Sequence, residues 1–382
     1  MSIVASVVDT LAEMFPQGAA LHEPRFAGNE QRYVDEAIRS TFVSSVGAFV
    51  DRFEAELAHA TGAKRAVAIA NGTSALHACL HLVGVSVGDE VLVPALTFVA
   101  TANAVLLTGA TPHFIDVEAR SFGVDATKLA EHLQRIAEKR DDGCYNLQTG
   151  RRIRAVVPMH AFGHPVDMDA LRAVADRYAI IVVEDAAESL GSVYKGVHTG
   201  RHGRIAAVSF NGNKIVTSGG GGAILTDDEA LGTLAKHVTT TAKISHPWEF
   251  VHDQMGFNYR MPNLNAALAC GQLEQLPIFL EKKRRLAQRY VEAFAQVEGV
   301  QVMREPDYGR SNYWLNVLLL GTEHAAERDA ILAAAHQRKI QARPVWKLMH
   351  RLPFLQGSPR ADLTVAEDLE RRAICVPSSS FL

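Results

Sequence analysis

"AIIVVEDAAESL", residues 179–190, is the stretch that decides the fold. Its five apolar residues without alternation are typical of a strand that is covered on both faces of a parallel sheet. Asp185 follows this predicted strand at its carboxyl end, where open parallel sheets bind their ligands. A carboxylate at that point is costly to desolvate unless it meets a positive partner. Asp185 is therefore either a helix N-cap or the partner of a cationic group, such as a protonated ring nitrogen of a cofactor.

Six further apolar runs flank this stretch on both sides, at Ala66–Ala70, Glu90–Pro94, Thr111–Val117, Ile153–His160, Ile205–Phe210 and Gly222–Thr226. Helical patterns between the runs predict parallel βαβ units. A polar segment at 139–154 predicts a surface hairpin around Thr149 and Gly150.

The pattern changes after about residue 250, where a helix is expected from Asn263 to about Ala295, followed by a strand at Tyr313–Leu320 and another helix. The fold class is therefore α/β. We expect a large domain at 1–250, with a mostly parallel sheet between helices, and a smaller C-terminal α+β domain at 251–382.

Composition narrows the class of protein. The chain has 382 residues, 48% of them apolar, and a net charge of −3, which implies neither a nucleic-acid partner nor an anionic membrane. Its four cysteines are widely spaced and form no C-x-x-C, so a disulfide framework or thiolate metal site is not expected, and the histidines form no H-E-x-x-H. The N-terminus reads as an amphipathic helix, not a signal peptide. A cytoplasmic enzyme without a metal fits these features.

The segment "NGTSAL", which begins at Asn71, follows the run Ala66–Ala70. Thr73 and Ser74 stand where an N-cap is expected, and an apolar helix follows. Free N–H groups and hydroxyls at a helix N-terminus suit an anion such as phosphate. Plain helix capping is the alternative for these residues taken alone.

The segment "SFNGNKIVTSGGGGAIL", residues 209–225, places Lys214 before four glycines. A Walker loop needs its glycines before the lysine and a helix after it, so this segment is not one. The glycines allow the backbone to pass close to a bulky group or to adopt positive φ. A lysine in a partly desolvated pocket can attack a carbonyl, whereas a surface loop lysine is the alternative.

These features together match the needs of pyridoxal phosphate, which are an imine-forming lysine, a partner for the pyridinium nitrogen and a phosphate anchor. Lys214, Asp185 and the helix after Asn71 would supply them. Phe98, at the end of another predicted strand, could stack on the ring face or simply belong to the core.

The sequence resembles the DegT-type sugar-nucleotide aminotransferases, which are pyridoxal-phosphate enzymes of fold type I. The motifs that carry the resemblance are "NGTSAL", "LTFVATANAV", "EDAAESLGS", "SFNGNKIVTSGGGGAILTDD" and "MGFNYRMPNLNAALACGQLEQL". They run in order across roughly residues 20 to 350. The residues of these motifs are most similar to those of the legionaminic-acid branch and its bacillosamine relatives.

The resemblance implies a role for each matching position. Lys214 would bond to the cofactor and move the proton, and Asp185 would pair with the ring nitrogen. The other implied cofactor contacts are Gly72, Thr73, Ser74 and Ser209 near the phosphate, Phe98 on the ring face, Glu188 near the ring hydroxyl, and Asn258 reaching the phosphate of a neighbouring subunit. Relatives often carry Gln at the position of Glu188. Segments bordering the substrate would include Ser44, Ser45, His160 and His350.

The activity implied is a transamination from glutamate to a keto sugar, expected to be a 4-keto-6-deoxy-N-acetylhexosamine linked to UDP or GDP, in bacterial surface-glycan amino-sugar biosynthesis. The enzyme would be a homodimer with shared active sites. Some family members carry His in place of the lysine and are dehydratases, so Lys214 favours transamination. The alternatives are an aminotransferase for a free keto sugar acid or another sugar carbon, and a sensor that binds the cofactor without catalysis.

Overall fold

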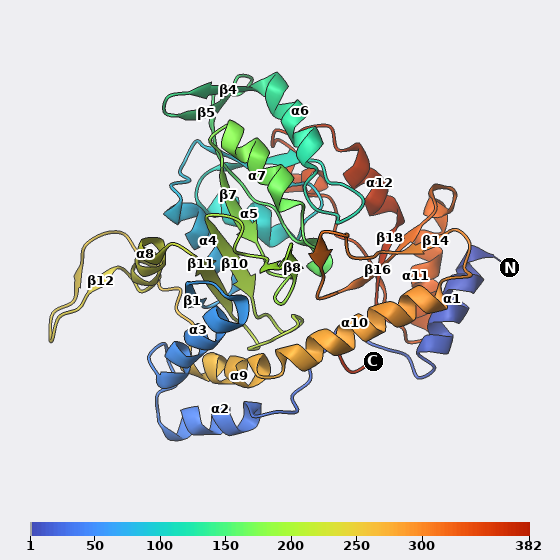
Figure 1. The fold of residues 1–382 in the computed structure, drawn as a ribbon, viewed down its shortest axis with the longest axis horizontal. Helices are drawn as coiled ribbons and strands as arrows, with labels where there is room; N and C mark the ends of the chain where they lie inside the picture. Colours follow the sequence, from blue (N-terminus) through green and yellow to red (C-terminus); the bar gives the residue numbers. More distant parts are fainter. Residues whose placement is uncertain (1) are drawn as a thin grey trace.

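The structure, a computed structural model, describes residues 2–382 and is built around a nine-stranded sheet (Figure 1). Its main path runs β1 (Arg65–Ile69), β11 (Gly222–Thr226), β10 (Ile205–Ser209), β7 (Ile181–Asp185), β6 (Arg152–Val156), β2 (Glu90–Pro94) and β3 (Thr111–Ile115). The pairs from β10 to β3 are parallel, and β11 is antiparallel to both neighbours. The mostly parallel sheet is therefore confirmed. β11 reverses because no helix carries the chain back between β10 and β11.

Helices cover both faces of this sheet, as the unbroken apolar strands predict. One face packs against α4 (Gly72–Leu82), α5 (Val99–Leu107) and α8 (Glu229–Thr239). The other face packs against α3 (Ala48–Thr61) and α9 (Asn263–Leu273) at one end, and α6 (Ala126–Ile136) and α7 (Met168–Arg177) at the other. Residues of one strand alternate between the faces: Val91 and Val93 belong to the first core and Leu92 to the second.

The polar excursion forms two hairpins, one more than predicted. β5 (Gly143–Asn146) pairs with β6 across the turn that contains Thr149 and Gly150, as expected. It also pairs with β4 (Ala137–Arg140), which the sequence pattern did not reveal because both strands are short and largely polar. The helix expected from Asn263 to about Ala295 is likewise two helices, α9 and α10 (Leu276–Ala293), with a proline in the first turn of α10.

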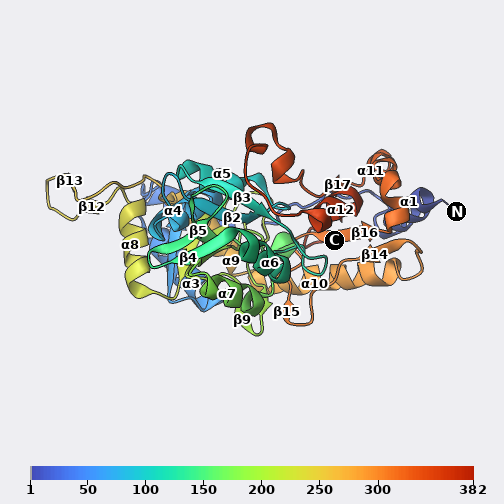
Figure 2. The same ribbon diagram turned by 90° about the horizontal axis from the view of Figure 1, so that it is seen from above.

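The C-terminal part carries its own antiparallel sheet of β14 (Val300–Val302), β16 (Asn316–Leu320), β18 (Ala373–Val376) and β17 (Arg343–Pro344), in that order. Its core also includes α10, α11 (Arg328–Gln337) and the N-terminal helix α1 (Ile3–Met14). Figure 2 shows α1 beside α11 at the end opposite α8. The helices α2 (Glu30–Arg39) and α12 (Thr364–Arg372) complete the α-helices of the described chain.

The division at residue 250 stays a prediction, and two helices pack across it. α1 lies in the core of the C-terminal part although it belongs to residues 1–250. α9 packs with α2 and α3 although it follows residue 250. A sequence boundary cannot reveal such exchanges, because a helix packs wherever its apolar face finds a partner.

A long arm protrudes beyond α8 in both views (Figures 1 and 2). It contains the short antiparallel pair β12 (Lys243–Ile244) and β13 (Val251–His252). A second small sheet joins β8 (Val193–Tyr194) to β9 (Val197–His198) and β15 (Gly309–Arg310). Between residues 2 and 382, none of the helices has both the length and the apolar character that crossing a bilayer requires.

Candidate active site

A cavity of about 460 Å³ opens at the carboxyl ends of β7 and β10, beside the N-termini of α4 and α5. Parallel strands and helix N-termini converge at such an edge, which is where open sheets bind ligands. Seven residues singled out in the sequence line this cavity: Gly72, Thr73, Phe98, Asp185, Glu188, Ser209 and Lys214. The fold thus brings together positions that lie up to 142 residues apart along the chain.

Lys214 projects into the cavity from the connection between β10 and β11. Its Nζ lies 3.3 Å from Oε1 of Glu188 and 4.0 Å from the centroid of the Trp314 ring. The other Glu188 oxygen accepts a hydrogen bond of 2.9 Å from the backbone N–H of Phe162. Burial raises the pKa of Glu188 to about 7, against the opposing effect of the Lys214 charge. A proton can therefore reside on Glu188 near neutral pH.

Asp185 ends β7 and is buried at the cavity wall. Its Oδ2 accepts a 2.7 Å hydrogen bond from the Thr101 hydroxyl, and its Oδ1 accepts one of 3.1 Å from the backbone N–H of Ala187. Burial raises the pKa of Asp185, and these two hydrogen bonds oppose the rise. A positively charged group in the cavity would oppose it further and keep the carboxylate ionised.

The N-terminus of α4 differs from the prediction in one detail. The N-cap is Asn71, not Thr73 or Ser74, because Asn71 has extended backbone and its Oδ1 accepts a 2.8 Å hydrogen bond from Ser74 N–H. Thr73 lines the cavity, whereas Ser74 is not among the residues that line it.

Two glycines permit close approaches here. A Cβ on Gly72 would lie 2.9 Å from Cβ of Ser209, so glycine lets the Ser209 side chain sit against the first turn of α4. A Cβ on Gly222 would lie 2.5 Å from the carbonyl carbon of Asn71. The last of the four consecutive glycines therefore makes room for the backbone of Asn71, where the sequence suggested room beside a cofactor.

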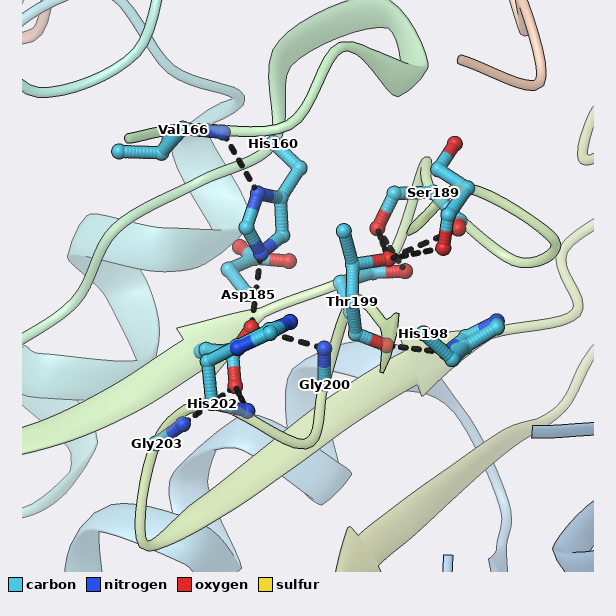
Figure 3. A network of polar contacts seen from close by, with 12 residues as sticks. His160, Val166, Asp185, Ser189, His198, Thr199, Gly200, His202 and Gly203 are labelled. Carbon is cyan, nitrogen blue, oxygen red and sulfur yellow. Dashed lines mark hydrogen bonds and ion pairs between the residues drawn. The ribbon is translucent and has the colours of Figure 1, made fainter. Parts of the chain in front are cut away.

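A buried network lies behind Asp185 (Figure 3). The side chain of Glu184 accepts hydrogen bonds of 2.6–2.7 Å from the backbone N–H groups of Gly200, His202 and Gly203, and it contacts Nε2 of His160 at 2.9 Å. Burial opposes ionisation of Glu184, but these hydrogen bonds outweigh it and lower its pKa to about 2. The network holds the loop after β9 against the end of β7.

His160 was expected to line the site, and the structure places it in this network instead. Its Nδ1 accepts a hydrogen bond of 3.2 Å from Val166 N–H, which leaves Nε2 to donate to Glu184. His160 is fully buried and is not one of the residues lining the cavity. Its backbone N–H donates to the Asp185 carbonyl at 3.2 Å, so it fixes the strand end that carries Asp185.

The remaining predicted residues also lie outside the cavity lining. His350 is buried in a short 3-10 turn, where its Nε2 lies 3.4 Å from Oε1 of Glu367. Ser44 and Ser45 lie in the exposed segment before α3, and the Ser44 carbonyl accepts a 2.6 Å hydrogen bond from Asn263 N–H. Asn258 is exposed at the base of the arm, bridged to Thr240.

Sequence reasoning missed several cavity residues, among them Trp314, Arg343 and Trp346. Trp314 was treated only as part of a strand-like run, in which an aromatic residue carries no separate signal. Arg343 and Trp346 follow α11 in the C-terminal part, and no local pattern assigns them to a cavity built on the large sheet. Thr101 was missed because a hydroxyl inside an apolar helix carries no motif.

The residues around the cavity fit pyridoxal phosphate. Lys214 offers a primary amine, Asp185 a buried carboxylate that favours a cationic neighbour, and the α4 N-terminus with Ser209 offers donors for a phosphate. Phe98 caps α5 and is 48% exposed, so its ring is available to a flat partner in the cavity. Glu188 could contact a ring hydroxyl.

Comparisons with known proteins agree with this chemistry. The model of the DegT/DnrJ/EryC1/StrS aminotransferase family matches residues 24–382. EpsN of Bacillus subtilis, whose name places it among pyridoxal phosphate-dependent aminotransferases, is 38% identical over 94% of this chain and 90% of that protein. GDP-perosamine synthase of Escherichia coli O157:H7 is 35% identical over 94% of this chain and 92% of that enzyme. The structure of DesI with its TDP-sugar product superposes with a TM-score of 0.84 at 26% identity, over 98% of this chain and 93% of DesI.

These relatives do not single out the legionaminic-acid or bacillosamine branch, so that finer resemblance stays a prediction. The family, the fold type and the cofactor expected from the sequence are confirmed. The chain belongs to the DegT/DnrJ/EryC1/StrS family and is a pyridoxal phosphate-dependent sugar aminotransferase.

Proposed function

We propose that this enzyme transfers the amino group of glutamate to the keto group of a 4-keto-6-deoxy sugar, carried on UDP or GDP, for the synthesis of a surface glycan. The products would be 2-oxoglutarate and the amino sugar nucleotide. The observation that carries the proposal is the convergence of Lys214, Glu188 and Asp185 on one cavity beside a helix N-terminus. Relatives named for a GDP-sugar and a TDP-sugar support a nucleotide-linked substrate. An N-acetyl group on the sugar rests on the resemblance alone.

In this proposal, pyridoxal phosphate supplies the carbonyl that exchanges amino groups and a ring that accepts electron density. Asp185, oriented by Thr101 and Ala187, would stabilise a positive charge at the ring nitrogen. The first turn of α4, with Thr73 and Ser209, would hold the phosphate, and the Phe98 ring would pack on the cofactor face; all of these residues line the cavity. The Nζ of Lys214 accepts the proton that leaves the substrate carbon and returns it to the other reacting carbon.

Arg343 is our candidate for the carboxylates of glutamate. It lines the cavity at the start of β17, and none of the ion pairs within residues 2–382 involves it. Its guanidinium can bind a carboxylate in bidentate fashion. Because β17 belongs to the C-terminal sheet, the donor would bind between the two parts of the chain.

Bleaching of the cofactor by glutamate tests the first half of this proposal. We expect the visible absorption of the purified protein to fall on addition of glutamate and to return on addition of the correct UDP- or GDP-linked keto sugar. Lys214→Ala should abolish both changes, whereas Lys282→Ala, which alters an exposed lysine of α10, should leave them intact. Wild-type turnover by Lys214→Ala would disprove the role of Lys214. A yellow protein that glutamate does not bleach would favour the sensor.

We further propose a homodimer in which Asn258 reaches the phosphate site of the neighbouring subunit. Asn258 lies outside its own cavity at the base of an arm whose Trp248 and Phe250 are 77% and 79% exposed. Exposed apolar groups of this kind favour a protein partner.

Mixed dimers test whether sites are shared. Lys214→Ala and Asn258→Ala proteins should each have little activity. After subunit exchange in an equimolar mixture, about half of the dimers contain one subunit of each kind, and one of the two sites in such a dimer carries both native residues. Mixing should therefore restore up to about a quarter of the wild-type sites. An unmixed Lys214→Ala sample is the control. Failure to restore activity although the subunits exchange would place Asn258 outside the neighbouring site.

A further inference from the structure

The amino group of Lys214 has a second neighbour that the proposed chemistry does not use. On one side lies Glu188, and on the other lies the face of the Trp314 ring, 4.0 Å from Nζ to the ring centroid. An ammonium at this distance from an indole face is attracted by the ring quadrupole, and the attraction grows where water is excluded. Trp314 is buried, at 4% exposure, so this contact is shielded from solvent.

Polar contacts on three sides fix the position of Trp314. Its Nε1 donates a 2.8 Å hydrogen bond to the carbonyl of Asn213, the residue before Lys214. Its backbone N–H donates to Oδ1 of Asn312 at 2.8 Å. Its carbonyl accepts a 3.0 Å hydrogen bond from Nζ of Lys283. The ring therefore cannot move without disturbing the segment that carries Lys214.

Asn312 links the backbone of Trp314 to the backbone of Glu188. While its Oδ1 accepts from Trp314, its Nδ2 donates to the carbonyls of Glu188 and Leu190 at 2.8 and 2.9 Å. One side chain thus ties together the backbones of the two residues whose side chains flank the Lys214 amine. Asn312 and Trp314 belong to the C-terminal part of the chain, and Glu188 lies in the connection after β7 of the large sheet.

Lys283 is an unusual support. It is fully buried in α10, and its Nζ donates only to backbone carbonyls, those of Trp314 and Ser378. Within residues 2–382 no carboxylate forms an ion pair with it. A buried amine without a carboxylate is costly. Burial also lowers the pKa of Lys283 to about 7. An apolar residue would fill this position at a lower desolvation cost. What the lysine adds is its two hydrogen bonds to backbone carbonyls.

We propose that Trp314 is a positioning residue that holds the amino group of Lys214 beside Glu188 whenever that group is not bonded to the cofactor, and that Lys283 holds Trp314 in place. This inference rests on the proposed role of Lys214 and goes beyond it. Each transfer frees the lysine amine, and a flexible side chain would otherwise sample many rotamers before its next proton transfer. The ring face and the carboxylate restrict it to one place.

Chemical labelling of Lys214 tests the contact directly. Full-length protein freed of cofactor is treated with acetic anhydride at fixed pH, and modification of the Lys214 peptide is followed by mass spectrometry. Only the uncharged amine reacts, and the ring face favours the ammonium. Trp314→Leu should therefore label roughly three- to tenfold faster than wild type, as expected from the usual strength of a cation–π contact. Trp314→Phe, which keeps a ring face, should stay within about twofold.

Trp346→Leu is the matched control for access. Trp346 lines the same cavity and stacks on Phe162, with ring centroids 4.7 Å apart, whereas the Lys214 amine lies over the Trp314 ring. Its labelling rate should stay near that of wild type. An equal rise in Trp346→Leu and Trp314→Leu would mean that a wider opening, and not a lost contact, explains the result, and the proposal would be overturned.

Fluorinated tryptophans give a measurement that does not depend on the fold of a leucine variant. Fluorine withdraws electron density from the indole face and changes its shape little. Protein made with mono-, di- and trifluorotryptophan should label Lys214 progressively faster. A flat series would overturn the proposal.

Lys283→Met tests the support, with Lys282→Met as its control, because Lys282 is exposed on the same helix. Labelling of Lys214 should rise roughly twofold or more in the first variant and stay unchanged in the second. If the labelling rate of Lys214 does not rise in Lys283→Met, Lys283 does not hold Trp314 in place. Absence of glutamate bleaching in the wild type would instead contradict the proposed function, and the labelling rates would still report on the contact.

Discussion

At the scale of single residues, Glu184 and Glu188 show how local donors set the charge of a buried carboxyl. Both are fully buried and lie four residues apart. Three backbone N–H groups and His160 hold the pKa of Glu184 at about 2. Burial raises the pKa of Glu188 to about 7. The Lys214 amine and the Phe162 N–H contact its carboxyl and oppose this rise without cancelling it. The first is a fixed anion, and the second can exchange a proton near neutral pH.

Glu184 should make the protein sensitive to acid. Its folded pKa lies below the ordinary value of 4.5, so its contribution to stability is full above pH 4.5 and is lost as the pH falls toward 2. The lowering corresponds to about 3 kcal/mol. Glu184→Gln should therefore flatten the dependence of the unfolding free energy on pH between 4.5 and 2, measured by urea titration. An unchanged slope would show that this carboxylate does not drive acid unfolding.

Glu188 should affect the stability of the fold in the opposite direction, by lowering it as the pH rises. Its folded pKa is raised, so its contribution is full below pH 4.5 and is lost as the pH rises through about 7. Glu188→Gln cannot ionise, and in cofactor-free protein its unfolding free energy relative to wild type should rise by about 3 kcal/mol between pH 4.5 and 8.5. The Glu184→Gln protein serves as the comparison because it should show no such rise. Parallel wild-type and Glu188→Gln curves would contradict the raised pKa.

At the scale of elements, the start of α4 joins stability to the cavity. Asn71 caps the helix, and Gly72 lets Ser209 approach its first turn. The remaining N–H groups of that turn face the cavity, as the lining by Gly72 and Thr73 indicates. The cap therefore fixes the direction in which a phosphate would be held.

Removal of this cap should weaken the helix and the phosphate site together. Asn71→Ala should lower the unfolding free energy by about 1 kcal/mol, the usual cost of a lost N-cap, and should weaken pyridoxal phosphate binding in a spectroscopic titration. Asn71→Asp, which can still accept from Ser74 N–H, should keep most of the stability. If Asn71→Ala is as stable as wild type, the 2.8 Å contact is not a functional cap.

At the scale of the whole molecule, the cavity depends on two parts of the chain that meet. β7 and β10 supply Asp185 and Ser209, and the C-terminal part supplies Trp314 and Arg343. Helices α1 and α9 pack across the division predicted at residue 250 and so tie the two parts together. Motions between the parts would change the distance from Trp314 to Lys214 and the shape of the donor site.

The arm makes a further prediction at this scale. Exposed Trp248 and Phe250 should bury themselves against a second copy of the chain. The double change Trp248→Ser and Phe250→Ser should therefore raise the dimer dissociation constant at least tenfold in analytical ultracentrifugation. Val87→Ser is the control, since Val87 is 82% exposed and belongs to the connection between α4 and β2, not to the arm. Unchanged dissociation would place the interface elsewhere.

The sequence by itself determined the main strands of the sheet and indicated the candidate reacting groups. Unbroken apolar runs specify strands that are buried on both faces; Asp185 ends one such strand, and Lys214 lies in the connection after another. Because strand ends meet at one edge of a parallel sheet, residues far apart in the chain could be assigned to one cavity. The same local rules could not separate Asn71 from Thr73 as the cap, since either residue type serves.

Only the tertiary structure decided which residues surround the lysine and what they do. Trp314 and Arg343 reach the cavity, and Thr101 reaches Asp185, through packing between distant segments, which leaves no periodic signal. His160 lies in a buried network with Glu184, although the family resemblance implied that it borders the substrate. The pKa values of Glu184 and Glu188 depend on how many N–H groups point at each oxygen. Local chemistry therefore determined where the site lies, and long-range packing determined its walls and its charges.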